Sequence, residues 1–327
     1  MPSSAAKLHP SQKKVDKIKS QEDAKKEEVV LGENNKYLKE NSHSSFLQSS
    51  SPKPQVDLNS MMKNSQTRVR KMLEGKPEFV MSLVKAQNML EKFAKNKTTF
   101  VVLHVDLVGS TKMAMRLPID RLTKIIQAFN QEMSIAVNAF GGYILKYVGD
   151  AVLAFFVISG NKSEARVAAP CINAVNCAKY MLRIAHEGIN PILNQYGYPE
   201  INLRIGVDIG ENAIIQSGWD IHTSIPSRRK NGKNVMITTT NRNEKQQRHH
   251  LPLVKKPVYD VLSYTLSIVV KMTALANPNH LVIGDPIYNR LDDKQRSGFQ
   301  RVHISPDLWD YVCKNSEGNI YNLYTDV

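Results

Sequence analysis

The chain has 327 residues, enough for one domain of ordinary size with an extension or for two small domains. Its formal net charge of +14 favours anionic partners: nucleotides, nucleic acid or an anionic membrane surface. It contains no apolar stretch of about 18 residues and no apolar N-terminal core, so we expect neither a membrane-spanning helix nor a signal peptide. Three cysteines without a CxxC pair indicate buried thiols in a reducing, cytoplasmic setting.

The first 75 residues are rich in lysine, serine, glutamate and asparagine, and few of their side chains are large and apolar. Such a segment cannot bury enough surface to offset the entropy lost on ordering, so residues 1–75 are predicted to be disordered. A solvated tail is favoured over a basic tethering arm. In residues 76–97, apolar side chains recur in steps of four and three from Phe79 to Phe93, which predicts a lead-in helix. A short dimerising coiled coil and a core-packed helix both remain open for this segment.

From residue 98 the pattern is typical of an α+β domain. Strands are predicted at 98–108, 143–148, 151–156 and 201–209, and helices at 118–140 and 165–196. The order βαββαβ predicts a ferredoxin-like sandwich. A C-terminal αβ and hairpin extension follows, with a helix at 261–276, a strand at 281–284, and a terminal hairpin of 308–313 with 320–324.

Residues 217–256 form a polar and basic insertion within the domain that spans 98–327. The insertion could be an anion- or nucleic-acid-binding flap. A solvated, partly disordered segment is favoured, because aromatic side chains that could stack on bases are nearly absent. A nucleic-acid-binding protein is therefore possible but not favoured.

Two carboxylates stand where predicted strands end. Asp106 closes an apolar strand, and Asp150 lies at the tip of the next hairpin. Taken singly, each is more often a cap or turn residue, but a ferredoxin-like sheet can place the two side by side. Paired acids repel and raise each other's pKa, which two Mg²⁺ or Mn²⁺ ions would relieve. The small residues Gly109, Ser110 and Thr111 that follow offer backbone N–H groups to phosphates.

These residues resemble the class III nucleotidyl cyclases (adenylate and guanylate cyclases). The first metal motif of that family is similar to HVDLVGST at 104–111, and the second to LKYVGDAVLAFF at 145–156. The central strand of the family is similar to LRIGVDIGE at 203–211. The segment that reads the base and stabilises the transition state is similar to VYDVLSYTLSIVVKM at 258–272. The resemblance covers residues 98–325.

The resemblance implies an adenylate cyclase. Asp106 and Asp150, with the Leu107 carbonyl, would hold two Mg²⁺ or Mn²⁺ ions. Lys146 and Asp260 match the pair that reads adenine: the ammonium donates to N1 and the carboxylate accepts from the N6 amine. Guanine presents the opposite pattern. The ribose 3′-hydroxyl of ATP would attack the α-phosphorus, giving cyclic AMP and pyrophosphate, at sites between two head-to-tail subunits of a homodimer.

Two positions depart from the family. Ser267 and Lys271 stand where the family has a ribose-orienting Asn and a transition-state Arg. Serine has a shorter reach, and lysine lacks the planar fork of arginine, so we expect a slow cyclase. Lys314 is the best match for the late phosphate-binding lysine. The alternative is a catalytically weak cyclase-homology domain that binds nucleotide and regulates a partner.

Overall fold

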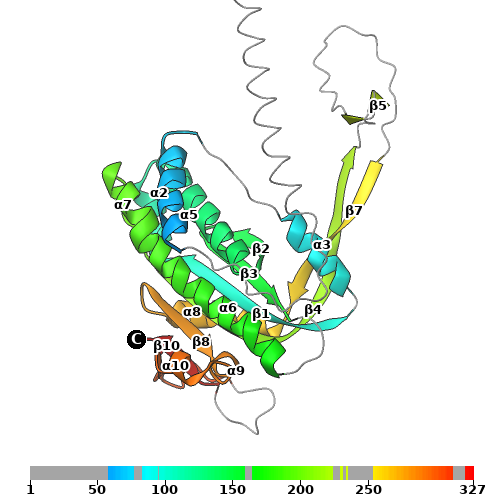
Figure 1. Ribbon diagram of the computed structural model, residues 1–327, viewed down its shortest axis with the longest axis vertical. Coiled ribbons are helices and arrows are strands. Elements are labelled where there is room, and N and C mark those ends of the chain that lie inside the picture. The colour runs from blue at the N-terminus through cyan, green and yellow to red at the C-terminus, as the bar shows by residue number, and fades with distance from the viewer. Residues whose placement is uncertain are drawn as a thin grey trace, which may run out of the picture. The chain divides into compact units, whose positions relative to one another are not determined.

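The computed structural model describes residues 58–76, 83–94, 96–158, 164–223, 229–230, 233–234, 253–311 and 321–327. They fold around one mixed sheet with strand order β2-β3-β1-β4-β8-β10-β9, and β7 pairs with β4 (Figure 1). The strands are β1 (Lys97–Leu107), β2 (Tyr143–Val148), β3 (Ala151–Val157), β4 (Leu203–Thr223), β7 (Leu253–Leu262), β8 (His280–Gly284), β9 (Phe299–Arg301) and β10 (Leu323–Asp326). A separate short ribbon pairs β5 (Arg229–Lys230) with β6 (Lys233–Asn234).

The first four of these strands confirm the predicted fold class. Their spatial order is β2-β3-β1-β4, and each neighbouring pair is antiparallel. Helix α5 (Ile119–Ala139) connects β1 to β2, and α6 (Glu164–Arg183) begins the connection from β3 to β4. This is the ferredoxin-like βαββαβ arrangement. It brings the end of β1 beside the β2–β3 turn, as the two-carboxylate hypothesis requires.

Helices cover both faces of the sheet, and the alternation of β1 assigns its residues to one face or the other. Val101, Leu103 and Val105 pack in the core formed with α5 and α6. Phe100 and Val102 pack in the opposite core, which contains residues of α3 (Val84–Phe93) and α8 (Tyr264–Leu275). Because side chains alternate, His104 and Asp106 belong to the α8 face of the sheet.

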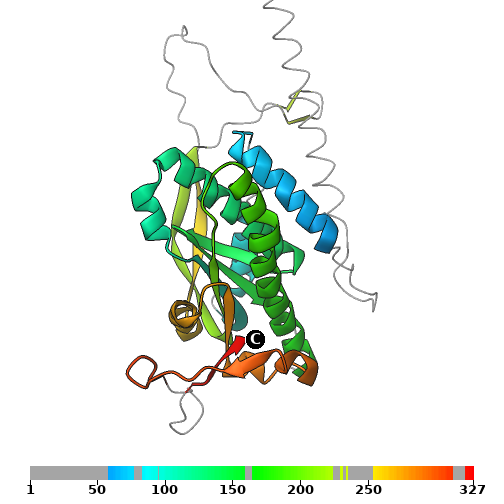
Figure 2. The same cartoon turned by 90° about the vertical axis from the view of Figure 1, so that its left-hand side faces the viewer.

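Helix α2 (Leu58–Leu73) lies inside the segment predicted to be disordered, so that prediction was wrong for these residues. Its buried side chains are Met62, Ser65, Val69, Met72 and Leu73. Figures 1 and 2 show α2 beside α5 and the helices that follow α6, which are η1 (Ile184–Ile189) and α7 (Asn190–Gln195). The Arg68 guanidinium makes two bonds of 2.7 and 2.6 Å to the buried carboxylate of Glu132 on α5. Residues 1–57 lie outside the described part.

Helix α2 packs against the π-helical turn η1. The predicted helix at 165–196 is broken into α6, the π-helix η1 and α7. Gly188 in η1 faces α2 so closely that a Cβ there would lie 2.7 Å from Ser65 Oγ and 3.1 Å from Met62 Sδ. A larger residue at this position would force the Ser65 side chain of α2 to shift.

The lead-in helix predicted for residues 76–97 is present as α3. Ala86 and Leu90, which would lie on the seam of a coiled coil, are buried in the chain's own core. Residues 77–82 lie outside the described part of the chain.

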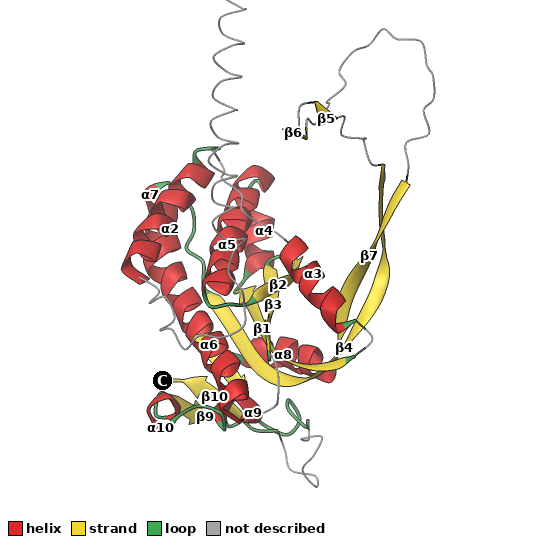
Figure 3. Cartoon of the chain, turned by 45° about the vertical axis from the view of Figure 1, so that its right-hand side comes forward, coloured by secondary structure: helices red, strands yellow, loops and turns green. Residues whose placement is uncertain are grey.

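The long ribbon formed by β4 and β7 replaces part of the predicted insertion. Strand β4 continues past residue 209 to Thr223 and pairs with β7 back to Leu253, with a bulge between Gln216 and Gly218 (Figure 3). Residues 217–223 and 253–256 are therefore strand, not a solvated loop. Most of the basic sequence between them lies outside the described residues.

The C-terminal extension contains the predicted helix (α8) and strand (β8), followed by α9 (Asp285–Tyr288), α10 (Asp293–Arg296) and an antiparallel strand pair. The strands of that pair differ from the prediction. Strand β10 pairs with β9 and β8, not with residues 308–313. The described part of 308–313 forms a turn and extended chain in which Trp309 is buried and Tyr311 O accepts from Tyr321 N at 2.8 Å.

Candidate functional site

The structure brings the two predicted metal-binding carboxylates together. Asp106 stands opposite Ala151 in the β1–β3 register, and Asp150 is the neighbouring turn residue. Gly149 supplies the positive φ (62°) of that turn. Burial, the charge of Asp150 and a hydrogen bond with its side chain raise the pKa of Asp106, against the nearby Arg204. The rise indicates that Arg204 does not fully offset the effects of burial and of the neighbouring negative charge.

Arg204 belongs to the candidate site, although the sequence did not reveal it. It lies on β4 directly opposite Asp106, and its Nη2 is 3.4 Å from Asp106 Oδ2. Its Nη1 donates to the Ala274 carbonyl of α8 at 3.2 Å, which holds the guanidinium over the carboxylate. The pairing depends on the register between strands far apart in sequence. A guanidinium at this position can also bind phosphate oxygens bidentately.

The donor set suits hard divalent cations. Asp106 near the end of β1 and Asp150 in the β2–β3 turn would supply carboxylate oxygens, and Leu107 follows Asp106 directly with its backbone carbonyl. Within the described residues, no group of three or more acids, histidines or cysteines is arranged so that it could hold a metal ion by itself. The other ligands would be water, backbone and substrate phosphate oxygens, as is usual for Mg²⁺. The predicted phosphate cradle borders this point: Gly109 (φ 72°) precedes Ser110 and Thr111 in the first turn of α4 (Ser110–Arg116).

His104 is a second residue beside the carboxylates. It precedes Asp106 by two positions on the same face of β1, and its side chain is 7 % exposed. Burial lowers the pKa of His104 to about 4, although the Asp150 charge acts in the opposite direction. No partner for its Nδ1 occurs among the described residues. At neutral pH the imidazole is therefore uncharged and adds no positive charge to the site.

Lys146 and Asp260, predicted from the resemblance to read the base, form an ion pair. Lys146 lies on β2 and Asp260 on β7, and their Nζ and Oδ2 atoms are 2.5 Å apart. About a third of each side chain is exposed, 37 % and 31 %. The other carboxylate oxygen, Oδ1, accepts from Val261 N at 2.8 Å. The pair is therefore preformed and accessible to a ligand.

Ser267 and Lys271 lie one turn apart on an exposed face of α8, which begins at the N-cap Ser263. Ser267 Oγ donates to the Ser263 carbonyl at 3.4 Å. Lys271 Nζ lies 5.2 Å from the centre of the Tyr311 ring, and a hydrogen bond with Tyr311 raises its pKa. Lys314 lies outside the described residues.

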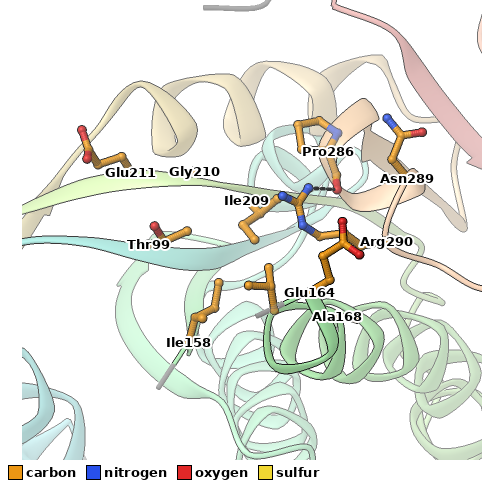
Figure 4. Close-up of a pocket in the computed structure, with 11 residues that line it drawn as sticks. Thr99, Ile158, Glu164, Ala168, Ile209, Gly210, Glu211, Pro286, Asn289 and Arg290 are labelled. Carbon is orange, nitrogen blue, oxygen red and sulfur yellow. Dashed lines mark hydrogen bonds between the residues drawn. The ribbon is translucent and has the colours of Figure 1, made fainter. Parts of the chain in front are cut away.

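Figure 4 shows a separate cavity of about 870 Å³, whose lining includes neither Asp106 nor Asp150. Thr99, near the start of β1, lines it together with Ile158 and Ile209, whose side chains belong to the core on the α5–α6 side. Glu164, Glu211 and Arg290 also border it. None of the residues predicted to bind metal or nucleotide lines this cavity, so it is not the nucleotide site described above.

Three curated relatives match part of the chain. Two are cytidylate cyclases of Escherichia coli: one is 31% identical over 232 residues, 68% of this chain and 42% of the relative, and the other is 29% identical over 130 residues, 39% and 28%. A cytidylate cyclase of Staphylococcus aureus is 30% identical over 113 residues, 35% and 26%. The resemblance to nucleotidyl cyclases is confirmed. The matches span less than half the length of these relatives.

Solved cyclase structures also align with the chain. The adenylyl cyclase CyaB from P. aeruginosa covers 71% of this chain and 95% of its own, with a TM-score of 0.48 and 15% identity. The guanylyl cyclase Cya2 gives the same TM-score and identity over 71% and 92%. No protein-family model matches. Among the described residues, no helix is both long and apolar enough to cross a membrane.

Proposed function

We propose that the chain is a nucleotidyl cyclase that converts CTP, in preference to ATP, into the 3′,5′-cyclic monophosphate and pyrophosphate. The observation that carries the proposal is the Asp106–Asp150 pair under the Arg204 guanidinium, with the Lys146–Asp260 ion pair on the neighbouring elements. The first group suits a triphosphate with divalent ions, and the second suits a base.

The choice of base follows from the hydrogen-bonding edge that Lys146 and Asp260 would meet. Adenine presents an amino donor beside the ring acceptor N1, and cytosine presents an amino donor beside the ring acceptor N3. An ammonium and a carboxylate complement both edges, so the expectation of ATP rests on a pattern that CTP satisfies equally. Guanine and uracil present an oxygen acceptor beside a ring N–H, which this pair would repel. The relatives named cytidylate cyclases favour cytosine.

The reaction would form one P–O bond and break another. The ribose 3′-oxygen attacks the α-phosphorus, its proton passes to solvent, and pyrophosphate leaves. Two divalent cations held by Asp106, Asp150 and the Leu107 carbonyl would promote ionisation of the hydroxyl and neutralise the leaving group. Arg204 would bind phosphate oxygens and keep the chain of phosphates in line. Lys146 and Asp260 would orient the base.

Ser267 and Lys271 suggest that the complete site needs a second copy of the chain. Both are exposed on α8, next to the exposed Val270 and Tyr264. In a head-to-tail homodimer, they would contact the ribose and phosphates bound to the carboxylates of the partner. Lys271→Arg restores the planar fork and should raise kcat about tenfold. An unchanged or lower rate would count against this placement of α8.

The test is product formation by the full chain with Mn²⁺ and each of CTP, ATP, GTP and UTP, with cyclic nucleotides identified by chromatography and mass spectrometry. Asp150→Asn is the control, because it preserves size and removes a ligand charge. Cyclic CMP from the wild type and not from the control supports the proposal, whereas cyclic AMP as the main product would return the assignment to adenylate cyclase. Saturable CTP binding without product would favour the alternative, a regulatory domain, for which the departures at Ser267 and Lys271 give a reason.

A further inference from the structure

One edge of β7 is held by a side chain from another element. Strand β7 pairs with β4 along its first edge. On the other side, the Tyr259 N–H donates to Gln87 Oε1 at 2.8 Å, and Gln87 Nε2 donates to the Tyr259 carbonyl at 3.0 Å. This reciprocal pair is the pattern that an antiparallel neighbour strand would make. The amide of Gln87, on α3, therefore substitutes for a strand at an edge that would otherwise lack partners.

The carboxylate of Asp260 follows directly along the same edge. Its Oδ1 accepts from the Val261 N–H at 2.8 Å, and its Oδ2 accepts from Lys146 Nζ at 2.5 Å. The orientation of the carboxylate is thus set by the backbone N–H of Val261 and by Lys146, and Asp260 itself is attached to the backbone of Tyr259. Movement of this edge would carry Asp260 away from Lys146.

Helix α3 contacts both strands that carry the ion pair (Figure 3). Its Ala86 and Leu90 are 2 % and 0 % exposed, in the same core as Leu145 of β2 and Val261 of β7. Gln87 follows Ala86 and is part-buried, so its amide projects from an anchored turn. The helix therefore fixes the Asp260 strand relative to the Lys146 strand.

We propose that Gln87 is a positioning residue for base selection: through its two bonds to Tyr259, it holds the Asp260 carboxylate where it can accept from the amino group of the base. This inference rests on the proposed function. It assigns a role in substrate choice to a helix that precedes the predicted catalytic domain and carries none of the predicted site residues.

The informative substitution is Gln87→Met, which keeps the length and volume of the side chain and removes both hydrogen bonds. The measured quantity is the ratio of kcat/KM for CTP to that for UTP, since uracil lacks the amino group that Asp260 would read. We expect the ratio to fall about tenfold, the equivalent of one or two hydrogen bonds. Asn88→Ala is the matched control, because Asn88 is exposed on the same helix and its Oδ1 accepts a long bond of 3.4 Å from Lys256 Nζ.

A double-mutant cycle separates positioning from general damage to the fold. If Gln87 acts through Asp260, Gln87→Met should not change the CTP/UTP ratio in an Asp260→Asn background. An equal fall in both backgrounds, or a loss of activity with an unchanged ratio, would overturn the inference. Should Gln87→Met be too unstable to purify, Gln87→Asn allows the same comparison, since its shorter stem cannot make both bonds.

A second measurement does not depend on turnover. Amide hydrogen exchange at Tyr259 should accelerate in Gln87→Met without nucleotide and remain unchanged in Asn88→Ala; equal exchange in all three proteins would contradict the inference. If the wild type binds nucleotides but makes no cyclic product, the proposed enzyme activity fails, and the ratio of Kd values for CTP and UTP decides the role of Gln87. If it binds neither nucleotide, both proposals fail.

Discussion

Arg204 lies over Asp106, with Nη2 of the guanidinium 3.4 Å from Oδ2 of the carboxylate on the neighbouring strand. Burial and the charge of Asp150 raise the pKa of this carboxyl by more than Arg204 lowers it. The site is thus built from one cation and two anions that do not balance. Binding of a triphosphate with divalent ions would supply both the missing positive charge and an anionic partner for the guanidinium.

Removal of the Arg204 charge should move the pH dependence of turnover. Arg204 lowers the pKa of Asp106, so Arg204→Met should raise that pKa further and shift the acid limb of the kcat/KM profile to higher pH. The rate at the optimum should fall about a hundredfold, through loss of a phosphate contact. Arg204→Lys, which keeps the charge, should retain the position of the acid limb. A limb that stays in place in Arg204→Met would refute the electrostatic link.

The melting temperature of the Asp150→Asn variant should no longer depend on divalent metal ions. Without divalent ions, the variant should melt at the same or a slightly higher temperature, because a repulsive pair of carboxylates has become a neutral contact. Mn²⁺ should raise the melting temperature of the wild type by about 2–4 °C, which corresponds to roughly 1 kcal/mol for a chain of this size, and leave the variant unchanged. Equal stabilisation of both proteins by Mn²⁺ would show that the ion binds elsewhere.

A buried carboxyl should make stability fall as pH rises. Asp208 is 1 % exposed; its Oδ2 accepts from the Tyr321 hydroxyl at 2.6 Å, and its Oδ1 accepts from Ile209 N at 2.8 Å. Burial raises its pKa to about 7, partly offset by these bonds. The folded pKa of Asp208 exceeds the unfolded value. The contribution of this carboxyl to the free energy of unfolding is therefore fully present below about pH 4 and is lost as pH rises through about 7.

The measurement is the free energy of unfolding by denaturant for the wild type and Asp208→Asn, near pH 5 and near pH 8. Between these values, the free energy of unfolding of the variant should rise relative to that of the wild type by up to about 3 kcal/mol, since the amide cannot ionise. Tyr321→Phe removes the hydroxyl donor that lowers the Asp208 pKa, so the loss of stability in this variant should extend to higher pH than in the wild type. Parallel curves for Asp208→Asn and the wild type would contradict the assignment.

The extent to which the site could be predicted depended on sequence distance. Asp106 and Asp150 were predictable as partners because a two-residue turn and strand alternation determine their places within one βαββ unit. The place of Arg204 depends on the pairing of β1 with β4, and that of Gln87 on the packing of a helix against a strand edge. No local pattern encodes either contact. The pairing of β10 with β8 and β9 was missed for the same reason, because both partner strands lie well before β10 in the sequence.

Helix α2 was missed because average composition conceals a narrow apolar stripe. Its flanks are polar, and only one face, with Met62, Val69 and Met72, is buried. Arg68 and Glu132 show that the helix is an integrated part of the fold, since a carboxylate that is 1 % exposed needs this guanidinium. The composition predicted a disordered, solvated segment, whereas tertiary contacts with α5 and η1 stabilise the helix.

Arg68→Met should therefore destabilise the whole unit and not only the N-terminal helix. The substitution leaves the Glu132 carboxylate buried without its partner, which should cost about 3–5 kcal/mol of unfolding free energy. The double variant Arg68→Met/Glu132→Gln replaces the ion pair with neutral side chains and should recover most of that loss. Denaturant unfolding, followed by the fluorescence of Trp219 and Trp309, reports the global transition, because neither tryptophan is in α2 and Trp309 packs in the other core. Arg68→Met could instead increase protease cleavage N-terminal to α5 and leave the global unfolding transition unchanged. That result would show that α2 unfolds separately, and it would refute the role of α2 in the core.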